Sequence, residues 1–188
     1  KVKLAGEGDD ARLAAVRESA PHATLIIDAN EAWREETLVA QLAACARVGV
    51  ALIEQPLPAH MIEETRWIRS RVHIPIFADE AFHNAEELPK LREAFDGVVV
   101  KLDKCGGLVA AQKQIHMAKA LGMKTMIGCM VSSSCTITAA AQLSPLVDYA
   151  DLDGHLLISN DPYTGVTVEK GKLILPTAPG MAVRPVSA

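Results

Sequence analysis

Three carboxylates stand at the ends of apolar, strand-like runs of this sequence. Asp28, Glu54 and Asp79 each directly follow such a run, at matching positions in successive segments. Neighbouring parallel strands lie about 4.8 Å apart, so carboxylates at their ends can converge on one ion. A site of oxygen ligands only suits Mg²⁺, which keeps water or substrate oxygens in its other positions. One such residue alone would indicate a helix cap or a solvated group, but three in succession predict a Mg²⁺ site.

Two pairs of lysines flank this acidic centre along the chain. Lys1 and Lys3 lie two residues apart on a strand-like run and therefore share one of its faces. Lys101 and Lys104 follow a later apolar run. A lysine that acts as a base needs a nearby cation or burial, which favours its neutral form. Lys1 is placed to act in this way on Lys3, as Lys104 is on Lys101. An ordinary surface role is the alternative for each of them.

A divalent metal flanked by two bases suggests one kind of reaction. The metal polarises a substrate carboxylate while one lysine removes the adjacent α-proton, which leaves an enediolate. The second lysine then returns a proton to the opposite face, and the product is the epimer. Lys3 and Lys101 would lie across from each other if the strands close into a barrel.

Two polar residues beside the carboxylates are expected to support the site. Asn30 follows Asp28 by two residues and could cap the next helix. Glu80 follows Asp79 directly, and we expect it to hold its neighbours in place rather than to bind the metal.

The elements that must position these residues alternate between strands and helices. Expected strands are Val2–Leu4, Leu25–Ile27, Ala51–Ile53, Ile74–Ala78, Val98–Val100, Thr125–Ile127 and Val147–Ala150. Expected helices are Ala11–Ser19, Glu35–Val48, Ile62–Ser70, Ala85–Ala94, Leu108–Leu121 and Ser134–Leu143. This alternation predicts an α/β fold with a parallel sheet. Polar residues at successive strand ends favour a TIM-type (β/α) barrel, whose active site lies on that face. A doubly wound sheet is the alternative, although no Gly-rich nucleotide motif follows a strand.

The alternation of strands and helices ends after Asp153. Residues 166–169 and 172–175 flank Lys170-Gly171, a pattern typical of a β-hairpin. We therefore expect a barrel portion over residues 1–154. Residues 155–188 would form a tail with a hairpin that packs on the barrel or on a further domain.

Composition limits the classes of protein that the chain can belong to. It has 188 residues, of which 49% are hydrophobic and 22% charged, with a net charge of −4. That length suffices for one domain with a core, and the apolar fraction argues against disorder. No apolar run reaches the roughly 18 residues that span a bilayer, and mild acidity predicts no nucleic-acid partner. Four cysteines without zinc or disulfide spacing indicate reduced thiols in a cytoplasmic protein.

Several short motifs together resemble one known family. They are KVK at 1–3, DAN at 28–30, EQP at 54–56, ADE at 78–80, KLDKCGG at 101–107, GCM at 128–130 and DLDG at 151–154. With these motifs the sequence resembles the muconate-lactonizing subgroup of the enolase superfamily, most closely its dipeptide epimerases of the L-Ala-D/L-Glu type. The resemblance implies a cytoplasmic Mg²⁺-dependent isomerase that acts on a dipeptide, with a role in cell-wall peptide turnover.

The resemblance also implies roles for single residues. Asp28, Glu54 and Asp79 would bind Mg²⁺. Lys3 and Lys101 would be the two acid–base groups, with Lys1 tuning Lys3. Further residues would contact the substrate: Gly128, Cys129, Met130, Ser132, Asp151 and Asp153.

The paired aspartates of DLDG narrow the expected substrate. Asp151 and Asp153 match the residues with which dipeptide epimerases hold the free ammonium group of the dipeptide. Two carboxylates two residues apart on an extended segment can chelate an ammonium by charge-assisted hydrogen bonds. A solvated turn is the alternative for this segment. An N-acylamino acid racemase or an o-succinylbenzoate synthase has no ammonium to bind there.

The length of the chain adds a last expectation. A (β/α)₈ barrel needs eight strands and about 250 residues, whereas the expected strands here correspond to strands two to eight. We therefore expect the first strand and the N-terminal capping domain of the family to precede Lys1. Other reactions of the superfamily stay open, cycloisomerisation among them, as do a non-catalytic fragment of a larger enzyme and homo-oligomerisation.

Overall fold

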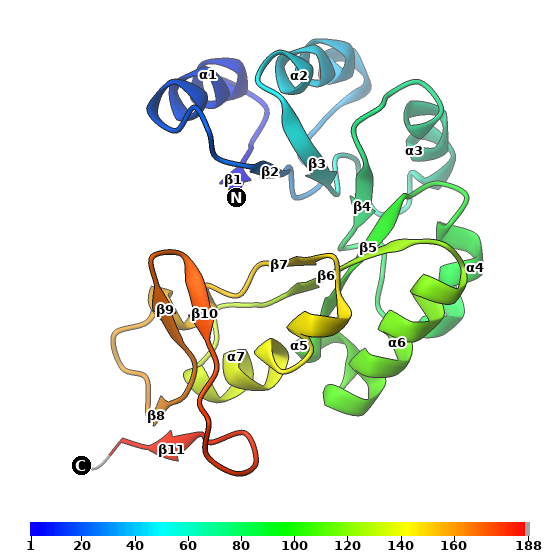
Figure 1. Cartoon of the computed structure of the whole chain (residues 1–188). Coiled ribbons are helices and arrows are strands. Elements are labelled where there is room, and N and C mark those ends of the chain that lie inside the picture. The colour runs from blue at the N-terminus through cyan, green and yellow to red at the C-terminus, as the bar shows by residue number, and fades with distance from the viewer. Residues whose placement is uncertain (187–188) are drawn as a thin grey trace. The chain divides into compact units, whose positions relative to one another are not determined.

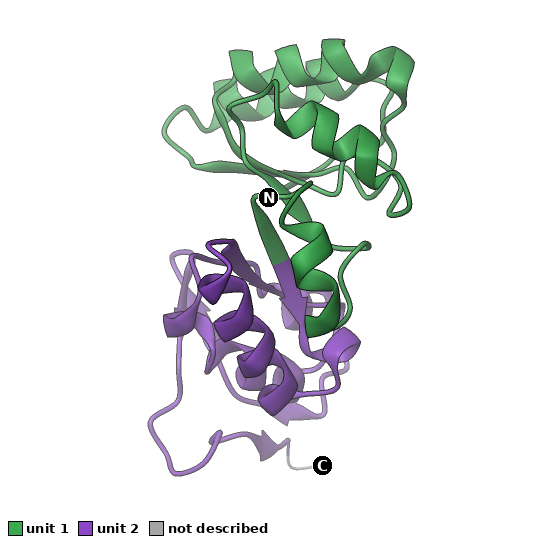
Figure 2. Cartoon of the chain, turned by 90° about the vertical axis from the view of Figure 1, so that its right-hand side faces the viewer, with its two compact units in different colours: residues 1–98 green, residues 99–188 purple. Residues whose placement is uncertain are grey.

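A computed structural model describes residues 1–186 of the chain (Figure 1). The chain forms two compact units, Lys1–Val98 and Val99–Ala188 (Figure 2). Both units alternate strands with helices, so the predicted α/β class is confirmed.

The first unit is built on parallel strands in sequential order. Its strands are β1 (Val2–Lys3), β2 (Leu25–Asp28), β3 (Val50–Glu54), β4 (Ile76–Ala78) and the start of β5 (Gly97–Lys101). Its helices are α1 (Asp9–Ser19), α2 (Glu35–Arg47), α3 (Ile62–Arg69), the 3₁₀ turn η1 (Ala85–Glu87) and α4 (Leu88–Leu91). The pairs β1–β2, β2–β3, β3–β4 and β4–β5 are all parallel. A doubly wound sheet would reverse its strand order partway, so this order favours the barrel-type interpretation.

The register of these strands decides which side chains meet. Lys3 lies opposite Asp28 on β2, and Asp28 lies opposite Glu54 on β3. Parallel strands end at the same edge of a sheet, so the three residues form a row at that edge. Register therefore brings together residues that are far apart in the sequence.

An apolar core supports this row. Ile27, Ile53 and Phe77 on β2, β3 and β4 are fully buried, as are Leu13 on α1 and Ile68 on α3. Burying each such side chain stabilises the fold by about 1.5–3 kcal/mol. The strand ends are thus fixed by the packing of the residues that precede them.

The second unit begins within β5 and continues the alternation. It contains α5 (Leu102–Cys105), α6 (Leu108–Ala120), β6 (Lys124–Gly128), α7 (Ser134–Ala141), η2 (Ser144–Leu146), β7 (Tyr149–Ala150), η3 (Gly154–Leu157), β8 (Tyr163–Thr164), β9 (Thr167–Glu169), β10 (Lys172–Ile174) and β11 (Arg184–Pro185). Strands β6 and β7 pair in parallel, whereas β8 pairs with β11 in antiparallel orientation. Fully buried Ile115, Ile127 and Ile137 form part of its core.

The predicted hairpin near the C-terminus is confirmed. Strands β9 and β10 are antiparallel, with Glu169 opposite Lys172. Between them Lys170 has φ of 49° and Gly171 has φ of 77°. Two consecutive residues with positive φ match a type I′ turn, whose twist suits a two-residue hairpin loop.

Two helical segments differ from the sequence-based expectation. The helix expected over Ala85–Ala94 is divided into η1 and the single turn α4. Pro89 lacks the N–H that a continuous helix would require. The short helix α5 was not predicted, and Gly106, with φ of 90°, ends it after one turn.

The tail is joined to α7 through Asp161. The N–H groups of Ser134 and Tyr163 donate to the two carboxylate oxygens of Asp161, at 2.7 and 3.0 Å. Burial alone would raise the pKa of Asp161, but the hydrogen bonds from Ser134 and Tyr163 outweigh burial and lower it below its ordinary value of 3.8. The charged carboxylate therefore stabilises the start of α7.

We expect this contact to make stability depend on acid pH. A carboxyl group with a lowered folded-state pKa stabilises the fold above its unfolded pKa, and that stability is lost as the pH falls through the folded pKa. The variant Asp161→Asn should therefore be less stable than wild type at pH 7, and the gap in urea midpoint should close below pH 3.8. Asp103→Asn, at an exposed carboxylate, serves as the control. A gap for Asp161→Asn that persists unchanged at low pH would contradict this role.

Among residues 1–186, no helix combines the length and the apolar character that crossing a bilayer requires. Cys45, Cys105, Cys129 and Cys135 are all free thiols. Burial raises the pKa of the Cys45 thiol to about 12, so this thiol stays protonated and unreactive near neutral pH.

Candidate active site

The three predicted metal ligands lie at strand ends of the first unit and are buried. Asp28 ends β2, Glu54 ends β3 and Asp79 directly follows β4. The exposed fractions are 0% for Asp28, 0% for Glu54 and 2% for Asp79. Burying an ionised carboxylate is costly unless cations or hydrogen bonds compensate its charge.

Lys1 and Lys3 compensate part of this charge. Nζ of Lys1 lies 3.0 Å from Oδ2 of Asp28 and 2.7 Å from Oε2 of Glu54, so it bridges the two carboxylates. Nζ of Lys3 also donates to Oδ2 of Asp28, and it donates to Oδ1 of Asn30 at 2.8 Å. The first unit thus gathers both lysines of the KVK motif around Asp28.

The two buried carboxyl groups respond differently to these surroundings. Burial raises the pKa of Glu54 to about 8, because Lys1 only partly offsets burial and the nearby charges of Asp28 and Asp79 add to it. Burial would also raise the pKa of Asp28, but Lys1 and Lys3 outweigh burial and lower it. Asp28 is therefore held as a carboxylate, whereas Glu54 needs further positive charge to ionise fully.

The donor set fits a hard cation. Oε1 of Glu54 is buried and accepts no hydrogen bond from the described residues, so one carboxylate oxygen is left for a further ligand. All three candidate ligands offer oxygen, which Mg²⁺ prefers. Within residues 1–186, however, no three His, Cys, Asp or Glu side chains are gathered as a metal-binding group, and the Lys1 ammonium lies between Asp28 and Glu54. Coordination of Mg²⁺ by Asp28, Glu54 and Asp79 therefore stays a prediction.

Asn30 links the loops that follow β2 and β4. Its backbone N–H donates to Oδ1 of Asp28 at 3.0 Å, and its Nδ2 donates to Oε1 of Glu80 at 2.9 Å. It does not cap α2, which begins at Glu35 with Arg34 as N-cap. Instead Asn30 has φ of 41°, and this left-handed turn directs its side chain to the neighbouring loop. Both Asn30 and Glu80 thus lie at the periphery of the carboxylates.

Gln55 is a positioning residue that the sequence analysis did not assign. It is fully buried, and its Oε1 accepts hydrogen bonds from the N–H groups of Asp79 at 3.0 Å and Ala81 at 3.1 Å. Its Nε2 donates to the carbonyl of Leu57 at 2.9 Å. Gln55 also has φ of 35°, an uncommon conformation for a residue other than glycine. The only feature of the sequence that could have indicated this positioning role is the place of Gln55 in the EQP motif.

We expect Gln55→Leu to destabilise the protein by about 1–3 kcal/mol, because the N–H groups of Asp79 and Ala81 lose their acceptor. Chemical denaturation would measure this loss. Gln142→Leu, outside this cluster, is the comparison variant. Equal stability of Gln55→Leu and wild type would show that water replaces the lost acceptor.

In the second unit Lys101 lies against Gly128. The Lys101 side chain at the end of β5 is buried, with 7% of the residue exposed. A Cβ atom at Gly128 would lie 3.2 Å from Cε and 3.4 Å from Cγ of Lys101, and 2.8 Å from Cγ1 of Val99. The absence of a side chain at Gly128 therefore makes room for the aliphatic part of Lys101.

The segments after β6 and β7 come together beside Lys101. Burial raises the pKa of the Cys129 thiol and outweighs a backbone hydrogen bond with Gly154, which lowers it. The charges of Asp151 and Asp153 also raise this pKa, whereas Lys101 lowers it. Cys129 is thus within electrostatic range of all three charged groups. A Cβ atom at Gly154 would lie 2.2 Å from the carbonyl oxygen of Met130, so the DLDG and GCM segments touch through their backbones.

Three further predicted residues, Met130, Ser132 and Lys104, are more exposed than the strand-end carboxylates of the first unit. Met130 is 44% exposed and Ser132 is half-buried in the loop before α7. Lys104 is half-buried on α5. The first unit therefore brings the KVK lysines to Asp28 and Glu54, with Asp79 after the next strand, and the second brings Lys101, Cys129 and the DLDG aspartates near one another. The catalytic and binding roles of these residues stay predictions.

Comparison with known proteins identifies the family. The family model for the enolase C-terminal domain-like family matches residues 1–187. An L-Ala-D/L-Glu epimerase of Bacteroides thetaiotaomicron is 40% identical over 184 residues, which are 97% of this chain and 48% of that protein. An N-acetyl-D-glutamate racemase of Pseudoalteromonas is 39% identical over 173 residues, 92% of this chain and 54% of that protein.

A solved structure supports the same relationship. A dipeptide epimerase from Cytophaga hutchinsonii, complexed with Mg and the dipeptide D-Ala-L-Val, superposes with a TM-score of 0.89 at 29% identity. The match covers 99% of this chain and 53% of that structure. The chain thus spans about half the length of the relatives that it matches. The strand-end motifs from which the resemblance was inferred fall within the matched region, and the chain belongs to the enolase C-terminal domain-like family.

Proposed function

We propose that this chain is the catalytic portion of a Mg²⁺-dependent epimerase that acts on dipeptides of the L-Ala-D/L-Glu type. The observation that carries the proposal is the pair of buried carboxylates Asp28 and Glu54 at adjacent strand ends, with the exposed Lys3 paired to Asp28 in register. Buried carboxylates in contact with lysines are costly for stability and typical of functional sites. The proposal is also supported by the relatives of this chain, which include an L-Ala-D/L-Glu epimerase and a dipeptide epimerase.

The chain's own residues supply the proton transfers in this proposal. Asp28, Glu54 and Asp79 would hold Mg²⁺, which supplies polarisation of the substrate carboxylate when it is bound. Lys3 exchanges a proton with the α-carbon on one face, and Lys101 does so on the other. Removal of the α-proton by either lysine leaves an enediolate, and protonation by the other gives the epimer. Lys1 keeps positive charge beside Asp28 and Lys3.

Asp151 and Asp153 decide the substrate class in this proposal. Two carboxylates after β7 bind the free ammonium of a dipeptide by charge-assisted hydrogen bonds. Cys129 and Met130, in contact with the DLDG segment through Gly154, and the nearby Ser132 would line the same pocket. An N-acylated substrate has no ammonium group for these two aspartates to bind.

A substrate panel tests the proposal against its main alternative. N-acylamino acid racemisation is the second candidate, because a relative of similar identity is named N-acetyl-D-glutamate racemase. With Mg²⁺ present, we expect epimerisation of L-Ala-L-Glu and little or none of its N-acetyl derivative, measured by α-hydrogen exchange in D₂O. Preference for the acetylated compound would overturn the assignment of Asp151 and Asp153. No exchange with any substrate would favour a non-catalytic role for this chain.

A further inference from the structure

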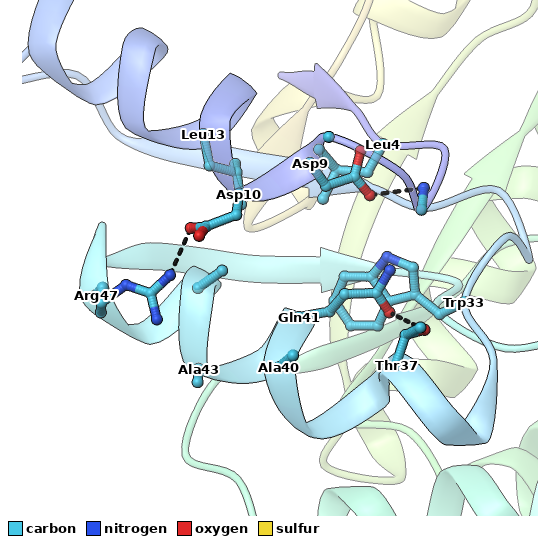
Figure 3. Close-up of a pocket in the computed structure, with 13 residues that line it drawn as sticks. Leu4, Asp9, Asp10, Leu13, Trp33, Thr37, Ala40, Gln41, Ala43 and Arg47 are labelled. Carbon is cyan, nitrogen blue, oxygen red and sulfur yellow. Dashed lines mark hydrogen bonds and ion pairs between the residues drawn. The ribbon is translucent and has the colours of Figure 1, made fainter.

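A cavity of about 350 Å³ lies between α1 and α2 in the first unit (Figure 3). Its walls are mainly apolar and include Leu4, Leu13, Trp33 and Ala44. None of the predicted metal ligands or lysine bases lines it. The volume is at the lower end of the range of small-molecule pockets, so the cavity can hold a compact ligand.

Two buried hydrogen-bond donors on the cavity wall have no acceptor. Nε1 of Trp33, a residue with no exposed surface, donates to none of the described residues. Nε2 of Gln41, which is 7% exposed, donates to none of them either. Oε1 of Gln41 lies 3.1 Å from Oγ1 of Thr37 (Figure 3), and the same hydroxyl lies 3.2 Å from the carbonyl oxygen of Arg34. Buried donors without partners are costly, so they indicate that an acceptor binds here.

The charges around the cavity limit the ligand further. The buried carboxylate of Asp9 accepts from the N–H groups of Ala5 and Gly6, at 3.0 and 2.8 Å, and from Arg12. Asp10 is paired with Arg47 (Figure 3). Buried negative charge on the wall disfavours an anion. Because both carboxylates are already satisfied, neither is available to bind a cation.

We propose that this cavity binds a small, neutral, apolar molecule that carries a carbonyl oxygen, such as a lactam or a secondary amide. The apolar body would pack against Leu4, Leu13 and the Trp33 ring. The carbonyl oxygen would accept hydrogen bonds from Nε1 of Trp33 and Nε2 of Gln41. The site is independent of the proposed epimerase reaction, because it shares no residue with it.

Titration with ε-caprolactam, followed by the ¹⁵N-labelled indole N–H signals, tests this proposal. The sequence has two tryptophans, and Trp67→Phe assigns the signal that belongs to Trp33. We expect the Trp33 signal to shift saturably, because its N–H gains an acceptor. Azepane, the same ring without the carbonyl, should cause no such shift, and cyclohexanecarboxylate should bind more weakly than the lactam.

Three variants separate this site from unspecific binding. Ala43→Leu places a larger side chain at the cavity and should weaken lactam binding by about tenfold or more. Ala46→Leu, on the same helix but outside the cavity lining, should leave it unchanged. Gln41→Leu removes one donor and should weaken binding by about tenfold. The absence of a saturable shift, an equal shift with azepane, or equal binding by Ala43→Leu and Ala46→Leu would overturn the proposal. An unshifted Trp33 signal in fast exchange with solvent would show that only water occupies the cavity.

Discussion

Replacing Lys101 by alanine is expected to lower the rate of epimerisation by about 10²- to 10⁴-fold, the usual contribution of general acid–base catalysis. Lys3→Ala should cause a loss of similar size, because each lysine serves one face of the α-carbon. The two variants should differ in D₂O. Each should still exchange the α-hydrogen of the one epimer whose proton faces the remaining lysine, which ¹H NMR of the separate epimers would reveal.

Lys113→Ala is a suitable control for this experiment, because Lys113 lies exposed on α6. It should retain wild-type rates with both epimers. Full activity of either Lys3→Ala or Lys101→Ala would refute the assignment of two bases. Loss of exchange with both epimers in each variant would instead indicate that one of the lysines mainly binds the substrate.

Replacing Gly154 by alanine is expected both to destabilise the protein by about 1–3 kcal/mol, as overpacking does, and to raise the KM for the dipeptide. The added Cβ would lie 2.2 Å from the carbonyl oxygen of Met130, 3.2 Å from Sγ of Cys129 and 3.2 Å from Cδ1 of Ile137. A backbone atom cannot move away as a flexible side chain can, so the DLDG segment must shift and carry Asp153 with it. Thermal unfolding and steady-state kinetics would measure the two effects.

Gly165→Ala provides a matched control with a similar steric conflict elsewhere. Its Cβ would lie 2.1 Å from Oγ1 of Thr138, where the tail meets α7. This variant should be less stable than wild type, but its KM for the dipeptide should equal that of wild type. If Gly154→Ala loses only stability, as Gly165→Ala is expected to, then Gly154 does not position the substrate-binding segment.

The sequence predicted the strands and the residues at their ends because those signals are local. An apolar run followed by a charged residue identifies a strand end such as Asp28 or Glu54 without knowledge of the rest of the fold. The same reasoning could not reveal that Nζ of Lys1 bridges Asp28 and Glu54, because this contact depends on strand register. The family was predicted from the short motifs at the strand ends and not from the periodicity of apolar residues.

Contacts between loops also could not be predicted from the sequence. Asn30 was expected to cap a helix but donates to Glu80, fifty positions along the chain. Gln55 was given no role, since nothing local distinguishes a buried glutamine that bridges two loops from a solvated one. The cavity between α1 and α2 likewise depends on how two helices separated by β2 pack against each other.

The hydrogen bonds of Asn30 and Gln55 have a consequence for how this half of the protein can evolve. Asn30 ties the loop after β2 to the loop after β4, and Gln55 ties the loop after β3 to the same loop. The three loops therefore form one cross-linked layer rather than three independent inserts. A change in the length of one loop would strain the bonds in the other two, so these loops should accept insertions far less readily than the exposed turn at Lys170-Gly171. Selection for new substrates would then act on the remaining segments while this layer keeps its geometry.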